Sequence, residues 1–219
     1  MNLPIAGLLA FALASMPDRA VPVEDEPHHK TVFKNEYVRA YRVNLEAGAT
    51  SLMHTHTHDD AAVRLSTATV AAESPGQPLG PPEPVYPGFV SARDNERKPH
   101  THQVHNIGAT LFDVIDVEVL RRPAGPVMPA SSVPTAENAK MRLYRYELDP
   151  GAASAQHAHS RPYLLVAATD GNLRMTSPDG ASLDHPLKAG DTHWVNTAGT
   201  HTIMNRGIEK AILVEFELK

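Results

Sequence analysis

The chain has 219 residues, 42% of them hydrophobic, so it can bury a substantial core in one large domain or two small ones. Its 20 basic and 25 acidic residues give a net charge of −5, which offers no basic face for phosphates and argues against nucleic-acid binding. Cysteine is absent, which excludes disulfides, thiolate metal sites and a cysteine nucleophile, whereas histidine is abundant at 13 residues.

The N-terminus carries a short apolar run from Ile5 to Ala14. This run is too short for a membrane-spanning helix of about 20 residues, but it matches the apolar part of a signal peptide. The last three residues of the run, Ala12-Leu13-Ala14, offer a small-x-small cleavage site, although no Lys or Arg precedes the run. We expect residues 1–20 to be a leader and the protein to be periplasmic or secreted, with a cytoplasmic location as the alternative. No other window could span a membrane.

The rest of the chain has the pattern of β-structure. Short segments such as "VFKNEYVRAYRVNL", "TLFDVIDVEVL" and "KAILVEFEL" are rich in β-branched and aromatic residues that cluster or alternate as strands do. No window of about 12 residues combines a helical apolar stripe with capping residues. The proline-rich stretch from Ala71 to Gly88 is expected to be a long surface loop outside any sheet.

A repeat divides the chain into two halves. The segment "VRAYRVNLEAGATSLMHTH", residues 38–56, returns 103 residues later as "MRLYRYELDPGAASAQHAH", residues 141–159. An offset of 99 residues then aligns His102 with His201 and Asn106 with Asn205. The tract of Pro, Ser and Ala between the copies is the natural linker. We therefore expect one domain over 30–122, a linker over 123–139 and a second domain over 140–219.

The spacing of the histidines is typical of a metal site. Residues i and i+2 of a strand point to the same face, so each H-x-H pair presents two imidazoles side by side. A third imidazole from a neighbouring strand would complete a facial set of three nitrogens with open coordination positions. The candidate metal ligands are His54, His56 and His102 in the first half, and His157, His159 and His201 in the second half.

Both halves resemble the cupin superfamily. Its first motif, G-x5-H-x-H-x(3,4)-E-x6-G, is similar to "GATSLMHTHTHDDAAVRLSTA" and "GAASAQHAHSRPYLLVAATDG", and its second, G-x5-P-x-G-x2-H-x3-N, to "SARDNERKPHTHQVHN" and "GDTHWVNTAGTHTIMN". The second half matches better, with Gly171 and Gly190 in place and Asn196 replacing the proline. The resemblance covers roughly residues 30–219. It implies an all-β bicupin of two tandem jelly-roll barrels (double-stranded β-helices), with any metal inside a barrel.

The motif glutamate is missing from both halves. Counting from the histidines places Leu164 and Ala61 at its position, and neither side chain can bind a metal. Asp60 and Tyr163 lie one residue earlier, so Asp60 could be a fourth ligand if the turn is one residue shorter. A site of three histidines is the simpler interpretation, and it would favour an anionic, chelating substrate.

Several further residues have both a functional and a structural interpretation. The asparagines of the second motif could support the site or tie a strand end, His193 and Trp194 could line the cavity or pack within the wall, and Arg39 and Arg142 could hold a carboxylate or form structural ion pairs. His58, His100 and His105 are expected to face solvent near a barrel opening. The candidate pocket residues are Asp60, Tyr163, Asn106, Asn205, His193 and Trp194.

The cupin resemblance implies a metal-dependent enzyme, most plausibly a dioxygenase-like oxidoreductase acting on a small chelating organic substrate. The expected cofactor is a divalent transition metal, with Fe(II) favoured and Mn, Ni, Cu or Zn as alternatives. Two other functions stay open: a non-catalytic cupin that binds a small molecule or metal, and a metal-dependent isomerase or decarboxylase. The expected partner is a small-molecule substrate, and paired barrel edges would favour a homodimer.

Overall fold

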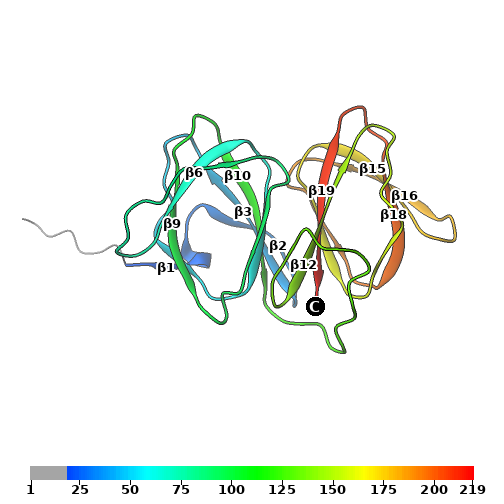
Figure 1. Ribbon diagram of the computed structural model, residues 1–219, viewed down its shortest axis with the longest axis horizontal. Helices are drawn as coiled ribbons and strands as arrows, with labels where there is room; N and C mark the ends of the chain where they lie inside the picture. The colour runs from blue at the N-terminus through cyan, green and yellow to red at the C-terminus, as the bar shows by residue number, and fades with distance from the viewer. Residues whose placement is uncertain (1–18) are drawn as a thin grey trace, which may run out of the picture.

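The computed structural model describes residues 19–219 and consists of two β-barrels side by side. Figure 1 shows the first barrel in blue to green and the second in green to red. The all-β tandem architecture expected from the sequence is confirmed. Residues 1–18 of the expected leader lie outside the described part of the chain. Among the described residues, no helix is long and apolar enough to span a membrane.

The N-terminal barrel is built from two five-stranded sheets, with strand orders β1-β4-β9-β6-β7 and β2-β3-β10-β5-β8. A short 3-10 helix, η1, follows the first strand. The elements are β1 (Val21–Pro22), η1 (Val23–Asp25), β2 (His29–Lys34), β3 (Val38–Leu45), β4 (His54–His56), β5 (Asp60–Arg64), β6 (Ala68–Glu73), β7 (Glu83–Val85), β8 (Val90–Arg93), β9 (His100–Asn106) and β10 (Phe112–Val119).

The C-terminal barrel repeats this plan with a five-stranded sheet, β11-β12-β19-β14-β17, and a four-stranded sheet, β13-β18-β15-β16. A segment without strands, residues 120–135, connects the two barrels. The elements are β11 (Ala136–Glu137), β12 (Met141–Leu148), β13 (His157–His159), β14 (Tyr163–Ala167), β15 (Gly171–Thr176), β16 (Ser182–Leu187), β17 (Thr192–Val195), β18 (Gly199–Asn205) and β19 (Ala211–Leu218).

Side chains on β10 and β19 alternate between the two faces of each strand, and this alternation separates three hydrophobic cores. Phe112 and Val114 point into the N-terminal barrel, and Leu213 points into the C-terminal barrel. Later residues of alternate parity, from Ile115 to Val119 on β10 and from Val214 to Leu218 on β19, point the other way into a core that both barrels share. This central core contains Val38, Ala40, Ala61, Val63, Leu65, Ile115, Val117 and Val119 from the first barrel and Met141, Leu143, Leu164, Val166, Ala168, Val214, Phe216 and Leu218 from the second.

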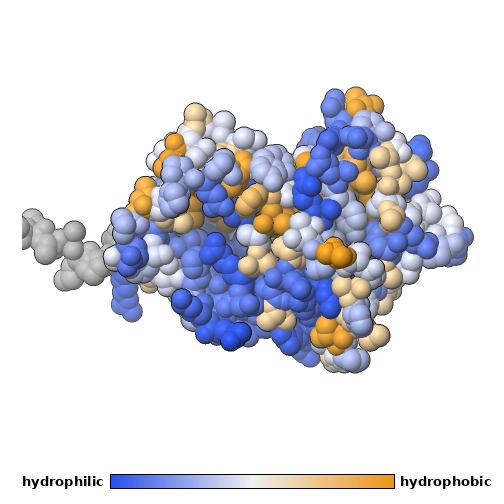
Figure 2. Space-filling model, viewed as in Figure 1, coloured by the Kyte–Doolittle hydropathy of each residue, from blue (hydrophilic) through white to orange (hydrophobic). Residues whose placement is uncertain are grey.

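The central core holds the barrels together by burying apolar surface. Trp194 packs at its edge, with its ring stacked 6.1 Å from Phe33 and 6.0 Å from Tyr37 of the other barrel, measured between ring centroids. Of its two interpretations, the packing role therefore fits Trp194, because its ring points away from the cavity of its own barrel. On the face of the molecule shown in Figure 2, hydrophobic residues are scattered among hydrophilic ones, as expected when the apolar surface is already buried.

The proline-rich stretch from Ala71 to Gly88 is not wholly a loop, and this corrects the expectation from composition. Its first residues continue β6, and Glu83–Val85 form β7, which pairs with β6 in antiparallel register. Pro84 is tolerated because β7 is the outermost strand of its sheet, where one side of the strand needs no hydrogen-bond donor.

Two glycine turns interlock the barrels reciprocally. Gly88, before β8, lies against the second barrel: a Cβ atom at this position would be 2.5 Å from Cγ2 of Ile212 and 2.7 Å from Nε of Arg145. Gly190, before β17, lies against the first barrel: a Cβ atom there would be 2.7 Å from Nη1 of Arg42. Both glycines have positive φ angles, +81° and +91°. The chain therefore needs glycine here for both conformation and space.

Replacing Gly88 with Ala should destabilise the protein more than replacing Gly76 with Ala. Gly76 also has a positive φ angle, +70°, but a Cβ atom there would meet nothing within 4 Å, so it controls for backbone strain alone. We expect the additional clash at Gly88 to cost about 1–3 kcal/mol of unfolding free energy, measured by chemical denaturation. Equal losses in the two variants would contradict the close contact between barrels.

Candidate metal centre

Four polar side chains converge inside the C-terminal barrel. His157 and His159 come from β13, His201 comes from the paired strand β18, and Glu215 comes from β19 on the opposite sheet. One ligand atom from each lies within 4.8 Å of all the others. Nε2 of His157 and of His159 are 3.1 Å and 2.9 Å from Oε2 of Glu215, and Nε2 of His201 is 3.1 Å from Oε1. Glu215 is completely buried.

The donor chemistry of this cluster fits a divalent cation. Nδ1 of His157 lies 3.0 Å from the carbonyl of Ala155, to which it can only donate. In a neutral imidazole, Nε2 then carries a lone pair, yet it faces a carboxylate oxygen, which is also an acceptor. Two acceptors cannot bond each other, so the neutral histidine and the carboxylate need a proton or a cation between them. Three imidazole nitrogens and one carboxylate are a typical set for first-row transition metals.

In the metal-free cluster, a proton on a histidine nitrogen can lie between the imidazole and the carboxylate. Burial alone would raise the pKa of Glu215, but hydrogen bonds from the three histidines outweigh burial and hold the pKa well below its usual range. Burial would likewise lower the pKa of His159, but the carboxylates of Glu215 and Glu217 raise it to about 9. The two residues therefore form a buried charged pair at neutral pH when no metal is bound.

Three tyrosines surround the cluster. Tyr146 stacks on His157 with ring centroids 5.0 Å apart, and Tyr163 stacks on His159 at 4.1 Å. Tyr144 meets His159 edge-on at 5.9 Å. Burial and the nearby glutamates raise the pKa of all three phenols, that of Tyr144 to about 12. The phenols stay protonated at neutral pH and can donate hydrogen bonds.

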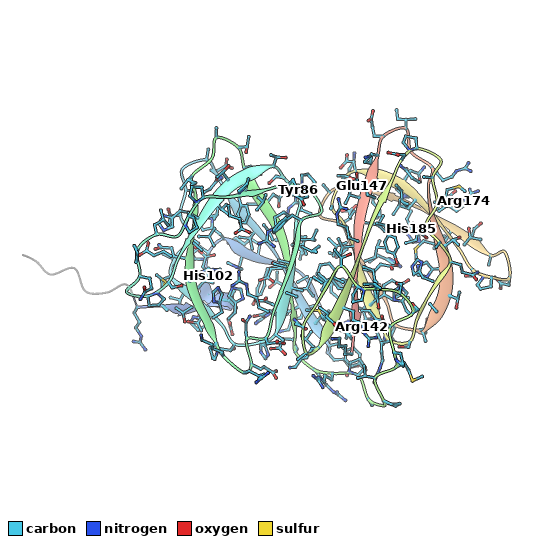
Figure 3. The ribbon with its side chains drawn as sticks, in the orientation of Figure 1. Tyr86, His102, Arg142, Glu147, Arg174 and His185 are labelled. Carbon is cyan, nitrogen blue, oxygen red and sulfur yellow. The ribbon has the colours of Figure 1, made fainter. Side chains whose placement is uncertain are left out.

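A cavity of about 440 Å³ reaches from the cluster towards the surface of the C-terminal barrel. His201 and Tyr163 lie at its inner end, and His185 and His193 line it further along, with ring centroids 5.0 Å apart. Figure 3 shows His185 inside this barrel and His102 inside the other. Of the two roles predicted for His193, lining the cavity therefore fits the structure. Its ring could give a small ligand a second polar contact.

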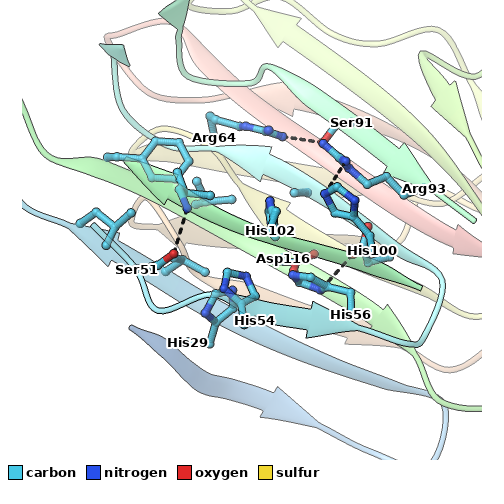
Figure 4. A pocket seen from close by; sticks show the side chains of 17 residues that line it. His29, Ser51, His54, His56, Arg64, Ser91, Arg93, His100, His102 and Asp116 are labelled. Atoms are coloured by element: carbon cyan, nitrogen blue, oxygen red, sulfur yellow. Dashed lines mark hydrogen bonds and ion pairs between the residues drawn. The ribbon is translucent and has the colours of Figure 1, made fainter. Parts of the chain in front are cut away.

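The N-terminal barrel encloses a smaller cavity, about 90 Å³, lined by polar side chains (Figure 4). His54, His56 and His102 all line it, with ring centroids 4.5–5.3 Å apart. His100, expected to face solvent, also lines the cavity, with its ring 4.4 Å from His102. The ligand atoms that come within 4.8 Å of one another belong to two sets, His29-His54-His56 and His56-Asp60-Asp116.

Charges in this cavity are distributed unevenly. Burial would lower the pKa of His56, but Asp60, Asp116 and Glu118 raise it to about 9. Burial lowers the pKa of His54 to about 4, and burial together with neighbouring histidines lowers that of His102. Burial and Asp60 raise the pKa of Asp116. At neutral pH, His54 and His102 are thus neutral imidazoles, whereas His56 would release a proton on binding a metal.

Known proteins share this architecture. No family model matches the chain. The β-alanine degradation protein BauB of Pseudomonas aeruginosa is 31% identical over 90 residues, which make up 40% of this chain and 94% of that protein. Among solved structures, Bacillus subtilis oxalate decarboxylase, studied for its Mn(II) centres, superposes with a TM-score of 0.54 at 14% identity, covering 84% of this chain and 69% of that one.

The chain belongs to the same family as BauB and has the fold of a bicupin. A second solved structure, AerE from Microcystis aeruginosa, covers 89% of the bicupin and 98% of its own chain, with a TM-score of 0.55 at 11% identity. At such low identity, the two structures support the fold alone. The two duplicated halves of the sequence correspond to the two barrels.

The missing motif glutamate has a structural explanation in this bicupin. Leu164 and Ala61 belong to the central core, so side chains at these positions point out of their barrels. The inward positions are one residue earlier, at Tyr163 and Asp60, which line the cavities. Asp60 therefore points into the barrel, as expected if the turn after the histidines is one residue shorter. Its Oδ2 atom lies 3.1 Å from Nδ1 of His56.

Glu215 was not among the predicted metal ligands. Its signal was present in "ILVEFEL", where two glutamates alternate with apolar residues in a strand that is otherwise hydrophobic. The offset of 99 residues that aligns His102 with His201 also aligns Asp116 with Glu215. A buried acidic residue in an apolar strand calls for a partner, and here the partners are the three histidines.

The other candidate residues have structural contacts. The side-chain amide of Asn205 donates to the carbonyls of Leu148 and Glu209, and Asn106 makes the same kind of tie in the first barrel, so both fit the strand-end role. Arg39 donates two hydrogen bonds to Glu118, and Arg142 donates to the carbonyl of Met128. These contacts favour structural ion pairing for Arg39 and anchoring of the connecting segment for Arg142.

The His159–Glu215 pair predicts how the stability of metal-free protein depends on pH. A histidine with a folded pKa of about 9, above its ordinary 6.5, stabilises the fold fully below about pH 6.5 and loses this contribution as pH rises through 9. Thermal unfolding of metal-free protein should therefore show a decline between about pH 6 and about pH 10 that Glu215→Gln flattens. Parallel curves for the two proteins would contradict the ion pair.

Proposed function

We propose that this bicupin is a metal-dependent enzyme whose C-terminal barrel holds a divalent first-row metal through His157, His159, His201 and Glu215. The convergence of three imidazole nitrogens on one buried carboxylate carries the proposal. When bound, the metal supplies Lewis acidity and, if it is redox-active, a path for electrons. Iron(II) is favoured, and manganese, nickel, copper and zinc suit the same ligands.

The cavity beside His201 supports a small organic acid as the substrate. One glutamate against a divalent ion leaves a net positive charge, which favours an anionic ligand with two chelating oxygens. Tyr163 can donate a hydrogen bond to a ligand oxygen, and the His185–His193 pair can contact its far end. These residues would orient the substrate against the metal and exclude water from one side of it.

The favoured reaction is a dioxygenase-like oxidation, because a histidine-rich site with open coordination positions beside a cavity suits iron and oxygen. A metal-dependent isomerase or decarboxylase is the second candidate. The ring of protonated phenols around the histidines favours it, since such donors stabilise the enolate that forms when a bond next to a carbonyl breaks. The structural likeness to oxalate decarboxylase is compatible with this second candidate.

Metal content per chain tests the proposal. Protein reconstituted with iron(II) or manganese(II) without oxygen should lose about one equivalent on His157→Ala or Glu215→Ala, since removing a ligand should weaken binding by at least about 100-fold. His105→Ala is the control, because its ring contacts Glu73 and Thr50 outside the cavities. Retention of all metal in Glu215→Ala would contradict the role of this residue.

Oxygen uptake with small chelating acids then separates the candidate reactions. Uptake that requires iron and disappears in His157→Ala would support the oxygenase. Release of carbon dioxide or rearrangement of the acid without oxygen consumption would support the second candidate. If wild-type protein binds no metal under any of these conditions, the enzymatic proposal fails and a binding function is left.

A further inference from the structure

The first residues of the described chain form a wedge against the histidine strand of the N-terminal barrel. β1 pairs in parallel with β4, placing Val21 beside His54, and the amide of Val21 donates to the carbonyl of Met53 at 3.0 Å. Val23 in η1 is 1% exposed and belongs to the core of this barrel. The wedge ends at His29, whose ring is buried in the cavity wall.

A buried glutamate fixes the position of His29. Oε2 of Glu26 accepts hydrogen bonds from the backbone amides of His28 and His29 at 2.8 Å and 3.2 Å, and it lies 2.7 Å from Nδ1 of His29. Oε1 accepts from the amide of Leu52, two residues before the first cavity histidine. Because Nδ1–H of His29 donates its hydrogen bond to this carboxylate, Nε2 of the neutral ring has its lone pair free.

Two further histidines share this arrangement. Nδ1 of His54 lies 2.8 Å from the carbonyl of Leu52, and Nδ1 of His56 lies 3.1 Å from the carboxylate of Asp60. Nε2 of His54 is buried and has no hydrogen-bond partner within residues 19–219. A carbonyl or carboxylate that holds one ring nitrogen while the other faces a cavity is the usual environment of a metal-binding histidine.

The three rings are close enough to share one ion. Their ligand atoms all lie within 4.8 Å of one another. His29 is 4.7 Å from His54 and 5.8 Å from His56 between ring centroids, and the residues are 8%, 1% and 4% exposed. The C-terminal barrel has no counterpart of His29, because the offset of 103 residues places Ser132 at the equivalent position. His29 is thus an addition to the duplicated pattern.

We propose that His29, His54 and His56 form a second metal site in the N-terminal barrel, with His29 taking the place that the sequence pattern assigned to His102. The site differs in kind from the C-terminal centre, because it offers imidazole nitrogens with no carboxylate in the ligand set. Such a set suits zinc or copper. Metal binding at this site does not require an active C-terminal barrel.

Zinc and copper titrations of the full chain test this site once the C-terminal centre has been removed. In the His157→Ala background, the protein should bind one equivalent of Zn²⁺, as measured by elemental analysis after dialysis. Adding His29→Ala should weaken this binding by at least about 100-fold. Adding His28→Ala should leave it unchanged, since the neighbouring His28 ring bonds to the carbonyl of Asn44 outside the cavity.

Two outcomes would overturn the proposal. One is His157→Ala protein that binds no Zn²⁺ or Cu²⁺. The other is the His157→Ala, His29→Ala protein that still binds one equivalent with unchanged affinity, which would return the ligand role to His102. If the C-terminal centre does not bind metal, the wild-type and His157→Ala proteins will have equal metal contents, and this result is distinguishable from both outcomes above.

A spectroscopic measurement on a second variant tests the site even if His29→Ala does not fold. Paramagnetic resonance of Cu²⁺ bound to His157→Ala protein should show coupling to three imidazole nitrogens. His29→Asn, which keeps a side-chain donor for Glu26, should reduce the number to two. An unchanged nitrogen count in a folded His29→Asn variant would also overturn the assignment.

Discussion

Two strands that are buried on both faces, β10 and β19, determine how the rest of this bicupin is arranged. Their outward residues form the middle of the central core, which joins the barrels through apolar contact. Their inward residues begin apolar and end acidic, with Asp116 and Glu118 on one strand and Glu215 and Glu217 on the other. The same alternation therefore creates the association of the barrels and the charge inside each one.

A buried carboxylate is costly unless it has partners, and the histidines supply them. In the C-terminal barrel, Glu215 reaches all three predicted histidines. In the N-terminal barrel the equivalent residue, Asp116, is one methylene shorter and groups with Asp60 and His56 instead. The duplicated pattern of histidines thus gives two different sites, because one side-chain length and one inward position, Tyr163 against Asp60, differ between the halves.

The sequence predicted the fold well because the cue was repeated. Two H-x-H pairs at a constant offset, each followed by H-x3-N, indicated both the duplication and the residues that gather inside each barrel. Glu215 and His29 were harder to find. An alternating strand shows that two faces exist but not which face meets the histidines, and "PVEDEPHHK" has a composition typical of an exposed lead-in. His29 enters the cavity because it begins β2, where it pairs with Val43 of β3, and because Glu26 holds its ring.

Contacts between the barrels differ between the two sides of the interface. Trp194 and Phe33 stack on one side of the interface, whereas the equivalent places on the other side hold Ala92 and Ala136. There, Asn138 bridges the barrels through the carbonyls of Asp60 and Arg93. The interface is nearly twofold in backbone and unequal in side chains.

That inequality has a consequence for how such a protein can change. If the barrels were separate, identical chains, every substitution in one cavity would appear in the other, and an improvement to one site would be tied to its effect on its twin. Because the segment 120–135 joins them in one chain, each cavity can acquire its own substitutions, and the covalent connection fixes the ratio of the two barrels at one to one. One molecule can therefore carry two cavities with different linings, as the two sets of clustered side chains here differ.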